Sequence, residues 1–124
     1  MMRFMNGKND GSPQVMLGDF NVGPHIPEAD IEGEYKENYD TIHNLVDGWI
    51  EANTDSDNPF CTYCSEENET GLFDGDTRSA IDHIWVRNAN VSNTKRILDK
   101  TFRALGGTWH PSDHFGVFAK ISKN

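Results

Sequence analysis

Three short hydrophobic runs, far apart in the chain, carry polar residues beside or inside them. They read LGDFN at residues 17–21, IDHIWV at 81–86 and SDHFGV at 112–117. Runs of this length, rich in aliphatic and aromatic residues, are typical of buried strands. A fold of this chain must therefore place several polar side chains at the ends of strands or within them.

The remaining pattern predicts a mixed α/β fold of the α+β type with an antiparallel C-terminal part. Strands are expected at residues 13–18, 81–87, 91–102 (one strand or two) and 115–121, and residues 51–75 read mostly as a long loop. A helix is expected from about Glu32 to Asp47, because apolar residues recur there at helical spacing. That stripe consists of Tyr35, Tyr39, Ile42, Val46 and Trp49.

Length and charge narrow the function classes. A chain of 124 residues is one domain or part of one. Residues 28–76 hold fifteen acidic side chains and one basic one, within a formal net charge of −9. Nonspecific DNA binding depends on neutralising phosphates with Lys and Arg, so this middle segment disfavours a broad DNA-binding surface. The more basic residues 77–124 could steer an anionic substrate. No run approaches the roughly 20 apolar residues of a membrane span.

The two cysteines, Cys61 and Cys64, form a single C-x-x-C. A structural zinc site needs a second pair of ligands, and a redox motif needs a strand before it and a helix after it. The sequence offers neither, so two inert thiols and a short disulfide both remain open.

Asp82 lies inside an otherwise apolar strand, where a buried carboxylate is costly unless it is paired. Histidine is a natural partner, but the neighbouring His83 points to the opposite face of a strand. We therefore expect Asp82 to pair with His114. The alternative is that Asp82 lies at the mouth of the strand, solvated or capping a turn.

Two further pairs of residues carry side chains that are suited to hydrolysis. The carboxylate of Asp113 is a hard oxygen ligand suited to Mg²⁺ or Mn²⁺, and the imidazole of His114 can exchange a proton or donate to a phosphoryl oxygen. Asp19 and Asn21 follow the first strand, at the edge where ligands gather in α/β sheets. The alternatives are a polar turn before the last strand and an Asx-type turn after the first.

In this order, the three strings resemble the later motifs of the endonuclease/exonuclease/phosphatase superfamily, which has a DNase-I-like fold. The family motifs are Gly-Asp-x-Asn, (Ile/Leu)-Asp-(His/Tyr)-(Ile/Val) and Ser-Asp-His. The matching residues here are Gly18-Asp19-Phe20-Asn21, Ile81-Asp82-His83-Ile84 and Ser112-Asp113-His114. The resemblance spans residues 14–121 and implies a sandwich of two sheets flanked by helices.

The resemblance also implies roles. Asp19 would position or activate the attacking water, and Asn21 would contact the scissile phosphate. Asp82 would pair with His114, which would act as general base or stabilise charge, and Asp113 would belong to a Mg²⁺ (or Mn²⁺) site. The reaction would be metal-assisted hydrolysis of a phosphoester by in-line attack. The substrate could be a nucleic acid, a phospholipid or a small molecule.

Family members carry their main metal-binding Glu, an Asn and a second His in a first half that has no counterpart here. We therefore expect residues 1–124 to be a single partial domain, the C-terminal half, with the missing N-terminal half as a partner. The alternative is an inactive family member that acts as a binding module. The sequence does not indicate a compartment.

Overall fold

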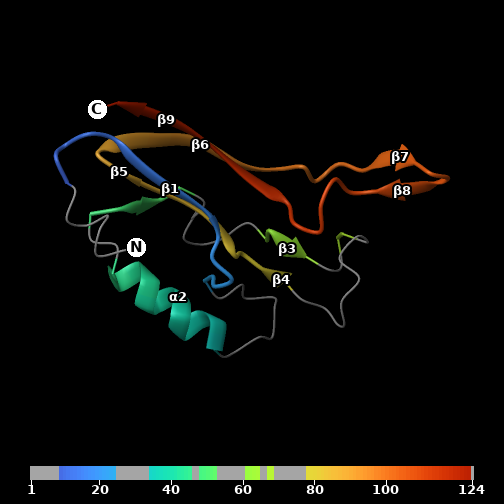
Figure 1. Cartoon of the computed structure of the whole chain (residues 1–124), viewed down its shortest axis with the longest axis horizontal. Coiled ribbons are helices and arrows are strands. Elements are labelled where there is room, and N and C mark those ends of the chain that lie inside the picture. The colour runs from blue at the N-terminus through green and yellow to red at the C-terminus, as the bar shows by residue number, and fades with distance from the viewer. Residues whose placement is uncertain are drawn as a thin grey trace.

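The computed structural model describes residues 9–24, 34–45, 48–52, 61–64, 67–68 and 78–123. This part of the chain is mostly strand (Figure 1). In chain order its elements are β1 (Gln14–Asp19), α2 (Glu34–Leu45), β2 (Ile50–Glu51), β3 (Tyr63–Cys64), β4 (Arg78–Ser79), β5 (Asp82–Arg87), β6 (Ala89–Ile97), β7 (Phe102–Ala104), β8 (Gly107–Trp109) and β9 (Gly116–Lys123). The strands form several small antiparallel sheets, so the expected antiparallel C-terminal part is confirmed and the pattern extends to β1.

The largest sheet has the order β1-β5-β2. β5 lies in its centre, which fits the apolar residues on both faces of this strand. Because β1 and β5 are antiparallel, the end of β1 lies beside the start of β5, and Asp19 is the register partner of Asp82. Asp19 lies at the C-terminal end of β1, as expected, and the strand beside it is antiparallel. Antiparallel pairing brings these two carboxylates to the same end of the sheet.

Helix α2 covers one face of this sheet (Figure 1). Alternate residues of the strands point to that face, and together with Tyr39 of the helix they form the main core. Its buried members are Met16, Val22, Tyr39, Trp49 and Trp85, with Phe20 and Ile42 packed against them. This core fixes the loop after β1, because Phe20 and Val22 both belong to it.

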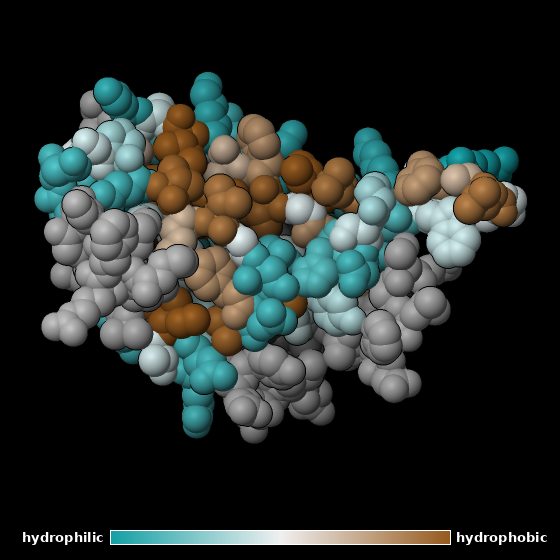
Figure 2. Space-filling view, in the orientation of Figure 1, coloured by the Kyte–Doolittle hydropathy of each residue, from teal (hydrophilic) through white to brown (hydrophobic). Residues whose placement is uncertain are grey.

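The opposite face of the sheet carries a second apolar set. Val15 and Leu17 of β1 and Ile50 of β2 are 41%, 69% and 56% exposed. Figure 2 shows hydrophobic side chains gathered in the middle of the molecule, over the region of β1 and β6. Asp19 and Asp82 lie on this same face at the end of the strands, because they alternate with the core-facing residues.

The helix begins and ends inside the range expected for it, and the expected residues beyond its ends, 32–33 and 46–47, lie outside the described residues. Trp49 was expected on the same helical stripe. It is buried in the core, but it reaches the core from the segment between the helix and β2. Gly48 precedes it with a φ of +72°, a left-handed conformation that glycine adopts without strain. None of the described helices is long and apolar enough to cross a membrane.

The C-terminal part is a long antiparallel ribbon. β6 pairs with β9, and between them the chain extends into the β7–β8 hairpin, which points away from the helix-covered sheet (Figure 1). Leu105 and Gly106 connect the two short strands, both with positive φ. The sequence pattern placed one or two strands in residues 91–102 and missed β8. Residues 112–114 lie between β8 and β9, just before β9 begins. They are beside the start of β5.

Candidate active site

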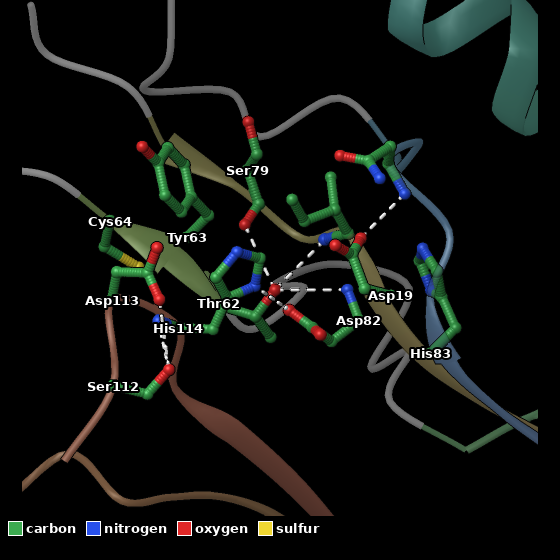
Figure 3. Close-up of polar contacts among 12 residues, drawn as sticks. Asp19, Thr62, Tyr63, Cys64, Ser79, Asp82, His83, Ser112, Asp113 and His114 are labelled. Atoms are coloured by element: carbon green, nitrogen blue, oxygen red, sulfur yellow. Dashed lines mark hydrogen bonds and ion pairs between the residues drawn. The ribbon is translucent and has the colours of Figure 1, made fainter. Parts of the chain in front are cut away.

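The side chains of Asp82 and His114 meet at the start of β5 (Figure 3). His114 Nδ1 lies 2.8 Å from Asp82 Oδ2, and because a carboxylate only accepts, Nδ1–H is the donor. Both side chains are about three-quarters buried, at 26% and 22% exposure. This hydrogen bond fixes the ring orientation and leaves Nε2 for a substrate. The two residues are 32 positions apart in sequence, and the fold brings them together.

The environment of His114 favours its protonated form. Partial burial lowers the pKa of its imidazole, but the hydrogen bond to Asp82 and the charges of Asp82, Asp19 and Asp113 outweigh this effect. The pKa is therefore raised above the ordinary value of 6.5. Three carboxylates thus act on one imidazole: Asp19 is the register partner of Asp82, and Asp113 directly precedes His114.

We expect an NMR titration of the imidazole nitrogens to give a His114 pKa above 6.5. In Asp82→Asn the pKa should fall, because the hydrogen bond to a charged acceptor and one negative charge are lost. Since the folded-state pKa is the higher one, the pair stabilises the fold fully below pH 6.5 and loses this contribution as pH rises through the raised pKa. An unchanged pKa in Asp82→Asn would contradict the assigned pairing.

Asp19 is the last residue of β1, and Asn21 lies on the loop that follows it. The backbone N–H of Asn21 donates to Asp19 Oδ1 at 2.8 Å, which is the Asx-type turn that the sequence left open. The turn uses one carboxylate oxygen and leaves Oδ2 for a further contact. Asn21 has a φ of 53°, in the left-handed region that Asn tolerates better than most residues. Both side chains are exposed, so they can reach a substrate.

Asp113 is exposed on the other side of His114, where its Oδ1 accepts from the hydroxyl of Ser112 at 3.1 Å. The resemblance implied that Asp113 helps to hold a divalent ion. In the described part of the chain, no three His, Cys, Asp or Glu side chains come together as a metal site. The described residues therefore do not by themselves fit a metal site, and we derive no catalytic step through an ion.

A second polar network, which the sequence did not predict, lies buried under the sheet. The hydroxyl of Tyr39 and Nδ1 of His83 each contact one carboxylate oxygen of Glu51. His83 Nε2 donates to the backbone carbonyl of Val22 at 2.5 Å. Burial and the contact with Glu51 raise the pKa of Tyr39 far above its usual value. His83 thus ties the Asp19–Asn21 loop to the core, and it does not face the Asp82–His114 pair.

Residues 61–64, which include β3, also adjoin the site. Cys61 and Cys64 form a disulfide, which settles the alternative that the sequence left open. The ring of Tyr63 lies 5.1 Å from that of His114, centroid to centroid. Thr62, between the two cysteines, is completely buried. The sequence did not predict its burial, because this part of the chain has no clear periodicity. No signal in a single sequence separates such a buried Thr from a loop Thr.

Basic side chains were expected to steer an anionic substrate, and two of them are used otherwise. Arg87 is 5% exposed, where it donates to Gln14 and lies over the ring of Trp49. Arg96 pairs with Glu67 at 2.7 Å and stacks on the buried ring of Phe115. Arg96 therefore supports the start of β9, next to His114, by packing.

A comparison with protein families shows which family contains these motifs. The model of the Endonuclease/Exonuclease/phosphatase family matches residues 2–114, which include every predicted site residue from Asp19 to His114. The chain belongs to this family. Members of the family are generally Mg²⁺-dependent phosphoesterases of DNase-I-like fold. No curated protein and no solved structure matches the chain.

Proposed function

We propose that the chain carries the water-activating and charge-stabilising part of a Mg²⁺-dependent phosphoester hydrolase. The observation that supports this most is the Asp82–His114 hydrogen bond of 2.8 Å, formed close to the carboxylates of Asp19 and Asp113. A carboxylate-oriented imidazole at the end of a strand, facing outward, is the arrangement that general acid–base chemistry needs.

Each residue has a distinct part in this proposal. Three carboxylates favour the protonated form of His114, so its Nε2–H donates to a phosphoryl oxygen and stabilises the negative charge of the transition state. The second oxygen of Asp19 orients the attacking water. Asn21, held by the Asx-type turn, donates its side-chain amide to the phosphate. With these roles, hydrolysis slows as pH rises through the pKa of His114.

The divalent ion that this family uses would need ligands beyond the described residues, with Asp113 as one contributor. The exposed apolar residues Val15, Leu17 and Ile50 favour the further proposal that a second layer covers this face. A two-sheet sandwich of DNase-I-like type has such a layer. We propose that this chain supplies the C-terminal half of that sandwich.

The test is hydrolysis of bis(4-nitrophenyl) phosphate, of a DNA duplex and of sphingomyelin vesicles, measured against Mg²⁺ concentration. The assay uses the chain as printed and the longest polypeptide that contains it. We expect product release that depends on Mg²⁺, and the preferred substrate identifies the class. If neither polypeptide hydrolyses any substrate at any Mg²⁺ concentration, the proposal fails.

One observation favours a second candidate function, a non-catalytic binding module of the same family. Within the described residues no three potential ligands form a metal site. A binding module would hold a phosphoester without turning it over. Equilibrium binding of a phosphodiester, unaffected by Mg²⁺ and without product, would support this candidate over the hydrolase.

A further inference from the structure

Thr62 occupies a central place beside the candidate active site (Figure 3). It is completely buried, directly before β3, and it lies between the two cysteines of the disulfide. Its side chain makes no contact with a substrate in the arrangement proposed above. Its hydrogen bonds connect the two segments that carry Asp82 and His114.

The hydroxyl of Thr62 holds the start of β5. Its oxygen accepts from the backbone N–H of Ile81 at 3.1 Å and from that of Asp82 at 3.2 Å. It also donates to the carbonyl of Ser79 at 3.4 Å. A hydroxyl has one donor and two acceptor sites, so these three contacts use its full capacity. The backbone of Asp82 is thus fixed through a side chain.

The backbone of Thr62 holds the other segment. Its carbonyl accepts from the N–H of Phe115, the residue after His114, at 2.7 Å. Its own N–H donates to the carbonyl of Ser79 at 2.9 Å, which anchors Thr62 to β4. The disulfide closes the short loop around Thr62, and Cys64 is 1% exposed. Thr62 is therefore hydrogen-bonded directly to Asp82 and to the residue that follows His114.

We infer that Thr62 is a positioning residue that sets the distance and orientation of Asp82 relative to His114. The inference rests on the proposed function only in taking this pair as the reactive centre. Its physical reason is that Asp82 lies at the start of β5 and His114 in the segment before β9, and Thr62 is hydrogen-bonded to both segments. A displacement of about 1 Å in a reactive pair can lower a rate about 10²-fold.

The experiment compares Thr62→Val, which keeps the shape and removes the hydroxyl, with Thr62→Ser, which keeps the hydroxyl. The first readout is the His114 pKa by NMR titration of the imidazole nitrogens. We expect Thr62→Ser to retain the raised pKa, and Thr62→Val to shift it toward the value of Asp82→Asn. Thr108→Val, on the exposed strand β8, is the matched control and should leave the pKa unchanged.

A purely structural role would give a different result. In that case Thr62→Val would unfold at a lower urea concentration while the His114 pKa stayed the same, and this outcome would overturn the inference. If Thr62→Val does not fold, amide hydrogen exchange in the unmodified chain decides. The N–H groups of Ile81 and Asp82 should be protected, and exchange at the rate of an unfolded peptide would contradict the role of the hydroxyl.

Activity supplies an independent readout. Where a polypeptide containing the chain hydrolyses a phosphodiester, Thr62→Val should lower kcat about 10²-fold with little change in KM, since binding groups are untouched. If no polypeptide is active while the pKa and exchange results hold, the hydrolase proposal fails and the positioning role of Thr62 stands. The two proposals therefore fail separately.

Discussion

Replacing His114 by alanine is expected to lower the rate of phosphodiester hydrolysis about 10²–10⁴-fold, the usual contribution of one acid–base group. The reason is that the variant loses the imidazole that we propose as the donor to a phosphoryl oxygen, and leaves Asp82 without the donor that lies 2.8 Å away. The measurement is initial-rate kinetics at saturating Mg²⁺, in the polypeptide that shows the activity.

His43→Ala is the matched control, because it removes an exposed imidazole on α2 that borders the rings of Tyr39 and Trp85, away from the pair. It should leave kcat and KM unchanged. Asp82→Asn should lower kcat less than His114→Ala, since the ring loses its charged acceptor but stays in place. Wild-type turnover in His114→Ala would remove this residue from the mechanism.

The second large effect concerns stability. Glu51→Ala is expected to lower the free energy of unfolding by about 3–5 kcal/mol, the usual consequence of removing one partner from a buried charged pair. His83 and Glu51 are 1% and 2% exposed, so water cannot replace the lost carboxylate. Tyr39 loses the same acceptor. Urea unfolding followed by tryptophan fluorescence measures the change.

Glu67→Ala is the control for Glu51→Ala. Glu67 pairs with Arg96 at the surface, with the two side chains 37% and 25% exposed. Surface pairs of this kind contribute about 0–1 kcal/mol, so this variant should unfold almost as the unmodified chain does. Equal losses in the two variants would show that the buried network contributes no more than a surface pair.

The sequence predicted the strands that carry the candidate site, because each has a continuous hydrophobic run with a polar residue at a defined place. It also predicted that Asp82 would avoid His83 and lie with His114, since alternation along a strand separates neighbours. It counted Trp49 in the helical stripe because the spacing fits, although the expected helix ended at about Asp47. Gly48, a common signal for a helix end, separates Trp49 from that helix.

Other parts of the fold depend on contacts that no local pattern encodes. Glu51 lies at the start of the segment read as a polar loop, and its role comes from Tyr39 and His83 across the core. Thr62 is similar, since its partners lie in β4, β5 and at the start of β9. Burial of a single polar residue is a tertiary property, and sequence periodicity does not report it.

Asp82 and His83 are adjacent in β5, yet one belongs to the outward-facing pair and the other to the buried network. A strand alternates its faces with a period of two residues. Inserting or deleting one residue just before β5 would therefore exchange the two side chains, turning an imidazole outward and a lone carboxylate into the core. Both systems would fail at once, so length variation in this chain is expected to avoid residues 79–82 and to fall in loops farther from the sheet.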